Sequence, residues 1–120
     1  MKSSSSVRIF SLDRERLLQD LRQACERLIR ERVEVEEVRL FGSLARGDAN
    51  AFSDADVLIL LNEDTETDPV ARILRYLPMF DLSRGVDLLV YTRAELQRAL
   101  EENPFIQQAW AESVLLAERG

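Results

Sequence analysis

RLFGSLARGDANAFSDADVLILL, residues 39–61, is the stretch that decides the fold of this chain. Its last five residues, Val57–Leu61, are all apolar. A short run rich in Val, Ile and Leu, bounded by turn-forming residues, predicts a strand buried on both faces of a sheet. Segment 38–41 is mostly apolar and is ended by Gly42-Ser43, so it predicts a second strand. The polar residues between the two strands therefore stand at the edge of the sheet.

Asp54 and Asp56 stand at the entry of the buried strand. Side chains two positions apart on a strand point to the same face, so these two carboxylates project together. Hard divalent cations such as Mg2+ take oxygen ligands, commonly one or two carboxylates plus substrate phosphates. The pair therefore predicts a metal site. Asp-x-Asp after a serine is also an ordinary way to begin a strand or a turn, and that interpretation stays open.

A second group of polar residues follows the first strand. Gly42-Ser43 ends that strand and the next residues open a helical turn, so backbone N–H groups near Ser43 are free to meet an anion. Glycine lets the anion approach closely, and the Ser43 hydroxyl and Arg46 add donors. The segment therefore predicts a phosphate-binding site at Gly42, Ser43 and Arg46. Alternatively, Gly-Ser is only a turn, and Arg46 forms a structural salt bridge with Asp48 or Glu63.

The joint spacing of these groups carries a resemblance. The pattern consists of Gly42-Ser43, ten residues and Asp54-Ala55-Asp56, with Ala45-Arg46-Gly47-Asp48 and Ser53 inside the gap. It resembles the signature of the nucleotidyltransferase superfamily that includes DNA polymerase beta. More closely, it resembles the minimal nucleotidyltransferases that act as antitoxins to HEPN-domain toxins. Those proteins are also single small domains, so the resemblance covers most of the chain.

The resemblance implies a third carboxylate on a later strand. Asp87 is the only acid in the strand-like segment 85–91, so the implied catalytic residues and metal ligands are Asp54, Asp56 and Asp87. Two Mg2+ ions held there would orient the triphosphate of ATP and lower the pKa of the attacking hydroxyl. Asp87 would act as general base, and the Gly-Ser segment would hold the β- and γ-phosphates. The alternative for Asp87 is a solvent-facing residue at the start of a strand.

The implied activity is transfer of AMP from ATP to a hydroxyl, namely a tyrosine of a cognate HEPN ribonuclease toxin, which the transfer silences. Two other functions stay open. One is an antitoxin that neutralises its partner by binding alone. The other is an enzyme on small molecules that resembles aminoglycoside nucleotidyltransferases. The sequence shows no acceptor pocket, and a domain of this size has little room for one, which favours a partner protein that supplies the acceptor.

Composition limits the class of protein and its partners. A chain of 120 residues with 46% hydrophobic and 32% charged residues is typical of one globular domain. The net charge of −6, with a single lysine, argues against an extended nucleic-acid track. Cys25 is the only cysteine, which excludes an internal disulfide, and the absence of histidine excludes a histidine base. Because no segment approaches ~18 apolar residues, we expect a cytoplasmic protein with no membrane partner.

Apolar periodicity predicts helices around the sheet. Residues 11–32 form a helical pattern, preceded by a serine-rich flexible tail over residues 1–10, so the single domain spans residues 11–120. A second helix begins at Asp68-Pro69, because proline suits the first helical turn. One apolar stripe of this helix comprises Val70, Ile73, Leu74 and Leu77. Beyond it, Met79, Phe80 and Leu82 form either part of the core or an exposed docking patch.

The last third of the chain predicts a strand, two helices and a final edge strand. The spacing of Thr92 and Glu95 is that of a capping box, which predicts a helix to about residue 102. Asn103-Pro104 begins a short helix with Phe105, Ile106 and Trp110, and residues 114–116 form the edge strand. Trp110 and Tyr91 are candidates for stacking on a base, although a place in the core is favoured.

The order of elements predicts an α/β (α+β) fold: a small mixed sheet with helices packed on one face. The other face would hold the carboxylates and stay open to substrate. This arrangement is the polymerase beta-like nucleotidyltransferase fold that the resemblance implies.

Overall fold

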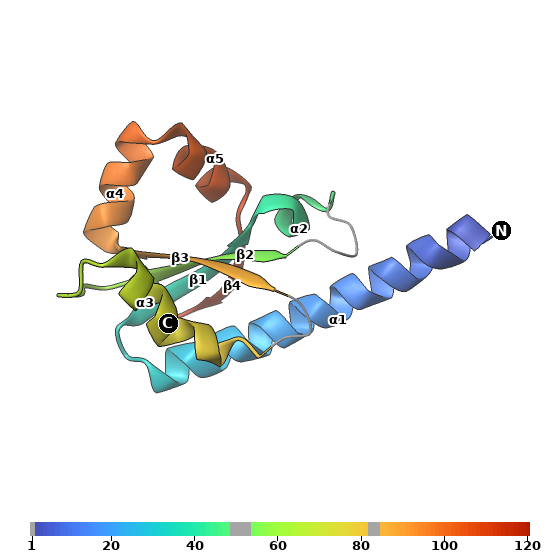
Figure 1. Ribbon diagram of the computed structural model, residues 1–120, viewed down its shortest axis with the longest axis horizontal. Coiled ribbons are helices and arrows are strands. Elements are labelled where there is room, and N and C mark those ends of the chain that lie inside the picture. Colours follow the sequence, from blue (N-terminus) through green and yellow to red (C-terminus); the bar gives the residue numbers. More distant parts are fainter. Residues whose placement is uncertain (1, 49–53, 82–84) are drawn as a thin grey trace.

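The protein folds around a mixed sheet of four strands, with helices against both of its faces (Figure 1). A computed structural model describes residues 2–48, 54–81 and 85–120. The described elements, in chain order, are α1 (Lys2–Glu31), β1 (Val35–Phe41), α2 (Gly42–Arg46), β2 (Ala55–Leu61), α3 (Pro69–Tyr76), the 3-10 turn η1 (Leu77–Met79), β3 (Val86–Thr92), α4 (Arg93–Glu102), α5 (Pro104–Glu112) and β4 (Val114–Glu118).

The strands lie in the order β3-β2-β1-β4, so the predicted buried strand β2 is internal. β1 runs antiparallel to both β2 and β4, whereas β3 runs parallel to β2. Every residue of β2 except Asp56 is buried. The predicted class, a mixed α/β fold with a small mixed sheet, is therefore confirmed, and its most apolar strand lies inside the sheet.

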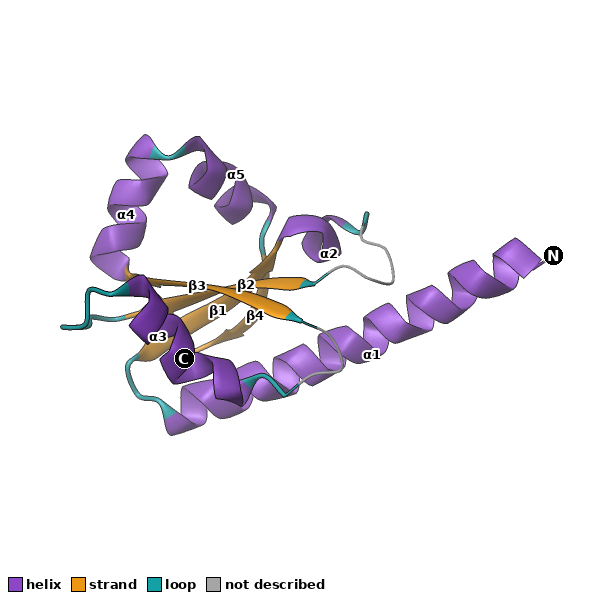
Figure 2. Cartoon of the chain, in the orientation of Figure 1, coloured by secondary structure: helices purple, strands orange, loops and turns teal. Residues whose placement is uncertain are grey.

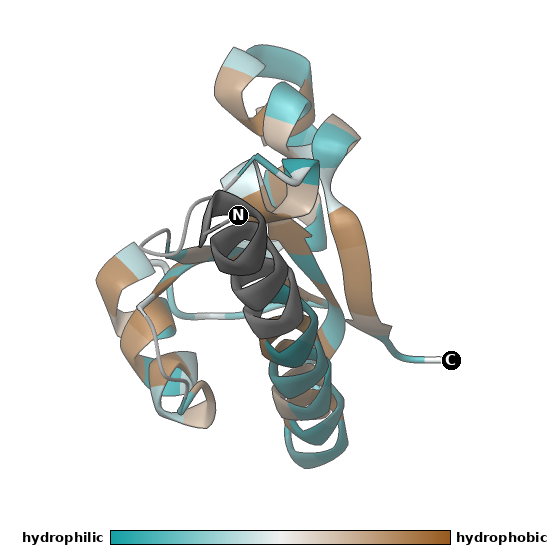
Figure 3. Ribbon diagram, turned by 90° about the vertical axis from the view of Figure 1, so that its right-hand side faces the viewer, coloured by the Kyte–Doolittle hydropathy of each residue, from teal (hydrophilic) through white to brown (hydrophobic). Residues whose placement is uncertain are grey.

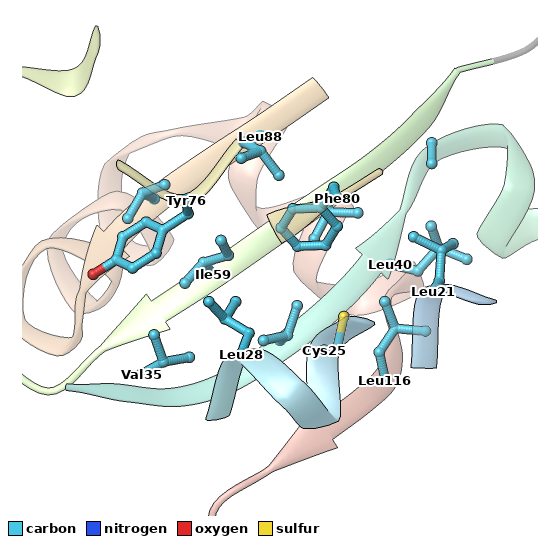
Figure 4. Close-up of a cluster of buried hydrophobic side chains, with 14 of the residues drawn as sticks. Leu21, Cys25, Leu28, Val35, Leu40, Ile59, Tyr76, Phe80, Leu88 and Leu116 are labelled. Atoms are coloured by element: carbon cyan, nitrogen blue, oxygen red, sulfur yellow. The ribbon is translucent and has the colours of Figure 1, made fainter. Parts of the chain in front are cut away.

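Helices cover both faces of the sheet, which corrects the prediction that they pack on one face only. Val57 and Ile59 point into a core cluster with α1, α3 and Phe80 (Figure 4). The alternate residues Leu58 and Leu60 point to the opposite face, where they join Leu96 of α4 and two residues of α5 in a second cluster. A strand that is apolar at every position must be covered on both sides, because its side chains alternate between the faces.

Helix α1 begins at Lys2, not at Ser11 as predicted. Nucleation is the unfavourable step of helix formation, whereas each further residue adds one hydrogen bond for one residue fixed. A packed helix therefore extends readily into a segment without glycine or proline. The packed part is anchored by Leu17, Leu21, Cys25 and Leu28, which are all buried. The N-terminal end of α1 extends beyond the sheet in Figure 1. The division of the chain into a tail and a domain stays a prediction.

Most of the apolar stripe of α3 is exposed, although such a stripe normally faces the core, and only Ile73 packs against the core. Val70 and Leu74 are 60% and 61% exposed, whereas Arg72 and Tyr76 on the inner face are 3% and 0% exposed. The inner face is polar but satisfied, since the Tyr76 hydroxyl donates to Glu34 at 2.8 Å. Burying hydrogen-bonded polar groups avoids the cost of burying unpaired ones. The hydrogen bonds of the inner residues with other segments therefore decide which face of α3 is buried, against the expectation from apolar periodicity alone.

Arg72 is the centre of the polar pairing beneath α3. Its Nη1 donates to Glu95 Oε1 at 2.5 Å, and its Nε donates to the Glu66 carbonyl at 2.7 Å. Asp64 lies 3.3 Å from the same guanidinium group. These partners come from α4 and from the loop before α3, so Arg72 ties three segments together. Phe80, which follows η1, is buried in the core as predicted, whereas Leu82 lies outside the described residues.

The end of the chain follows the predictions closely. Thr92 and Glu95 form a complete capping box at the start of α4, and Asn103 caps α5 with its side chain. β4 is an edge strand next to β1, and most of its residues are hydrophobic (Figure 3). Trp110 is partly buried beneath Arg39, whose guanidinium carbon lies 4.3 Å from the ring centre. Among the described residues, none of the helices is both long and apolar enough to span a membrane.

Candidate active site

Three aspartates meet where β2 and β3 begin. Asp56 is the second residue of β2, and Asp87 is its partner in the parallel pairing of β2 with β3. Paired residues on adjacent strands point to the same face, and the strands lie about 4.8 Å apart. Asp54 precedes β2 and is two residues from Asp56, so it belongs to the same end of the sheet. The structure thus places the three predicted carboxylates at the same end of the sheet, on the face that α4 and α5 cover.

Two glycines lie directly against these carboxylates. A Cβ atom at Gly42 would stand 2.2 Å from Asp56 Oδ2, and one at Gly85 would stand 2.6 Å from Asp54 Oδ1. Gly42 also has a positive φ of +75°, a conformation that residues with a side chain rarely adopt. Gly42 was predicted for its approach to phosphate, but its contact with Asp56 was not. Gly85 stands at the start of the segment that carries Asp87, and the sequence did not predict its contact with Asp54.

The electrostatic state of Asp56 reflects this crowding. Burial raises the pKa of the Asp56 carboxyl above its ordinary value, and the neighbouring charges of Asp87 and Asp54 raise it further, whereas Arg46 opposes them. Within the described residues, no three His, Cys, Asp or Glu side chains stand together as a group that could hold a metal ion. Three carboxylates are nevertheless the donors that Mg2+ prefers, and such ions commonly complete their shell with water and substrate phosphates.

Helix α2 places the Gly-Ser pair beside Asp56. It is five residues long and starts at Gly42, and its N-cap Phe41 has no side chain that could cap the first N–H groups. Ser43 is the second residue, and its carbonyl accepts hydrogen bonds from the backbone N–H groups of Gly47 and Asp48 at 3.0 and 3.1 Å. The turn thus ends immediately at Gly47, which has a φ of +84°. The start of α2 lies against Asp56, at the end of the sheet that carries the aspartates.

Arg46 is engaged in two ion pairs. Its Nε donates to Asp48 at 3.1 Å, and its Nη1 donates to Glu112 of α5 at 2.9 Å. The hydrogen bond to Asp48 raises the pKa of the guanidinium group. One of the two salt-bridge partners considered from the sequence, Asp48, is thus confirmed, while Glu112 was not foreseen. A role of Arg46 in phosphate binding stays a prediction, and its side chain is 42% exposed.

Helices α2 and α5 lie near each other (Figure 2). Residues of these two helices and Asp56 line a pocket of about 320 Å3. It is lined by Phe41, Gly42, Arg46, Asp56, Phe105, Gln108, Ala109 and Glu112. Sequence reasoning missed the contribution of α5, because only the tertiary fold brings that helix back to Asp56. A larger pocket of about 630 Å3 lies between α4 and β1, but it contains none of the three aspartates. The smaller pocket is therefore the candidate site, because it contains Asp56 and Gly42.

The fold is a mixed α/β fold with three aspartates at one end of its sheet, and comparison with known proteins specifies the family. The family model described as "Nucleotidyltransferase domain" matches residues 18–116. The chain therefore belongs to the nucleotidyltransferase domain family, and it is a nucleotidyltransferase enzyme. No curated protein matches the sequence. Ser53, which contributed to the sequence motif, lies outside the described residues.

Solved structures with a similar fold agree with this assignment. The crystal structure of a presumed nucleotidyltransferase from Sulfolobus solfataricus is 25% identical, with a TM-score of 0.66 over 88% of this chain and 84% of that one. A toxin-antitoxin structure with AMP-PNP is 20% identical, with a TM-score of 0.55 over 82% of this chain and 73% of that one. At this lower identity, the second likeness shows the fold alone.

Proposed function

We propose that this protein is a metal-dependent nucleotidyltransferase antitoxin. It transfers AMP from ATP to a hydroxyl group, namely a tyrosine of a cognate HEPN ribonuclease toxin. The observation that carries the proposal is that Asp54, Asp56 and Asp87 come to one end of the sheet, where Asp56 and the glycine-started turn of α2 line one pocket. A protein that only binds a partner would need neither the carboxylates nor the glycine-started turn beside them.

The donor set assigns a role to each residue. Asp54, Asp56 and Asp87 would hold two Mg2+ ions together with phosphate oxygens of ATP, which fits the raised pKa of Asp56 because a bound cation relieves the repulsion among the carboxylates. Bound Mg2+ supplies charge neutralisation and a more acidic acceptor hydroxyl. Asp87, which is exposed at the start of β3, takes the proton of that hydroxyl as general base. Gly42 and Ser43 bind the β- and γ-phosphates with backbone N–H groups, and Arg46 assists.

The acceptor is supplied by a partner protein in this proposal. A pocket of about 320 Å3 is at the lower end of the range for small-ligand sites, which is roughly 300–1,000 Å3, so it has little room for a second substrate beside ATP. The similar fold of a chain in a toxin-antitoxin structure supports a toxin as that partner. The HEPN class of the partner and its tyrosine are implied by the resemblance of the motif around Asp54 to that of minimal nucleotidyltransferases.

The test is transfer of label from α-labelled ATP to the protein encoded by the adjacent gene, with Mg2+ present. We expect label on the partner with the unchanged protein and none with the Asp54→Asn, Asp56→Asn double variant. The matched control is Asp20→Asn, Asp81→Asn, which removes two exposed carboxylates that line a different surface pocket and should keep transfer intact. Omitting Mg2+ should abolish labelling.

The other outcomes separate the rival functions. A stable complex that neutralises the partner equally well with the double variant, and no label at any time, would replace the proposal by an antitoxin that acts through binding alone. Label on an aminoglycoside with this chain alone, but not on any partner, would assign the protein to small-molecule transfer. Either result would refute transfer to a protein tyrosine.

A further inference from the structure

Phe105 is the exposed aromatic side chain beside the candidate site. It belongs to the first turn of α5, it is 62% exposed, and it lines the same pocket as Gly42 and Asp56. Trp110, which was a candidate for stacking on a base, is covered by Arg39 at 4.3 Å. A large hydrophobic ring that remains open in a pocket with both polar and apolar lining can receive a ligand with an apolar face.

The ring is exposed but well supported. It makes a T-shaped contact with Phe41, with ring centres 6.3 Å apart and an interplanar angle of 84°. The backbone N–H of Phe105 donates to Asn103 Oδ1 at 3.0 Å, and the next residue, Ile106, is only 2% exposed. A T-shaped contact occupies at most one face of the Phe105 ring. The structure therefore presents a ring of defined position with a face left for a ligand.

We infer that Phe105 is the platform on which the base of the bound nucleotide stacks, an inference that rests on the proposed function. The phosphates would lie at Gly42 and the carboxylates, and the base at the α5 wall of the same pocket. Stacking on an aromatic ring needs no particular pattern of hydrogen bonds, because every base has a π-face. Phe105 therefore contributes affinity for the nucleoside part of the substrate and not for its phosphates.

The test compares two ligands of the full-length protein by calorimetry in the presence of Mg2+. One is α,β-methylene-ATP, which carries a base and cannot transfer its nucleotide, and the other is tripolyphosphate, which has no base. We expect Phe105→Ala to weaken binding of the ATP analogue roughly 5- to 150-fold, the range of a lost stacking contact. Binding of tripolyphosphate should not change, and Phe105→Trp should bind the analogue at least as well as the unchanged protein.

Leu74→Ala is the matched control, because Leu74 is also an apolar residue, is 61% exposed and lies on α3, away from the pocket. It should bind both ligands normally. Equal binding of the ATP analogue by Phe105→Ala and by the unchanged protein would overturn the stacking platform and leave the proposed function standing. Equal weakening of both ligands would overturn it too, since Phe105 would then only support the fold. If the unchanged protein bound neither ligand, both proposals would fall.

Discussion

Replacing Gly42 by alanine tests the geometry of the site directly. The new methyl group would stand 2.2 Å from Asp56 Oδ2, far inside any real contact distance, and 3.1 Å from Asp56 Cγ. Relief requires the carboxylate to move by about 1 Å or more, which takes it out of its position in the pocket and near Asp87. A displacement of this size at a catalytic group costs about 10²-fold in rate. We therefore expect kcat/KM for transfer to fall about 100-fold or more.

Gly47→Ala separates this displacement from backbone strain. Gly47 has a φ of +84° and Gly42 has a φ of +75°, so an alanine at either position carries a similar left-handed penalty of about 1–2 kcal/mol. At Gly47, however, a Cβ atom would meet nothing within 4 Å. Gly47→Ala should therefore lose stability but keep its transfer activity, whereas Gly42→Ala should lose both.

The assay pairs urea denaturation with initial rates of transfer from α-labelled ATP for the two glycine variants. If Gly42→Ala transferred AMP as fast as Gly47→Ala at the same fraction folded, the contact between Gly42 and Asp56 would have no catalytic meaning. Equal loss of rate in both variants would also refute the reasoning, because it would trace the effect to strain in the α2 turn and not to the carboxylate.

Two further predictions concern stability. Asp56→Asn should raise the melting temperature at neutral pH: the folded-state pKa of Asp56 lies above its ordinary value of 3.8, so the unchanged protein loses stability as the pH rises through that folded pKa. The gain should vanish below pH 3.8 in a pH series of thermal denaturation. Arg72→Met should cost about 2 kcal/mol, measured by urea denaturation, because it leaves the partly buried Glu95 without its ion-pair partner, whereas Asp64 keeps its ion pair with Arg75. Since the hydrogen bond from Arg72 holds the pKa of Glu95 below its ordinary value of 4.5, the stability difference between Arg72→Met and the unchanged protein should shrink as the pH falls below that value.

Each of these two predictions has a contrary outcome. A fall in melting temperature at neutral pH for Asp56→Asn would show that the carboxylate is held by favourable contacts and not strained by its like-charged neighbours. A change below about 1 kcal/mol for Arg72→Met would show that α3 does not depend on its polar inner face. If the stability difference between Arg72→Met and the unchanged protein did not change with pH, the ion pair of Arg72 with Glu95 would not be its cause.

The local elements were predictable because their signals are local, and the candidate site residues could be named for the same reason. The apolar run of β2, the Thr92 capping box and the Asn103-Pro104 helix start each lie within a few residues, and the structure has each of them as predicted. The two aspartates at the entry of β2 follow from the period of a strand. Their convergence with Asp87 needed one further step, the implied pairing of two strands, which the parallel register of β2 and β3 provides.

Long-range packing decided the rest. Periodicity cannot tell that Arg72 meets Glu95, so it did not foresee that α3 buries its polar face and exposes Val70 and Leu74. It could not place α4 and α5 over the second face of the sheet, nor bring Phe105 to the pocket of Asp56. The sequence by itself determined most of the elements and which residues are candidates for the chemistry, because those depend on neighbours in the chain. Only the tertiary structure determined what surrounds that chemistry, because contacts between distant segments depend on the whole fold.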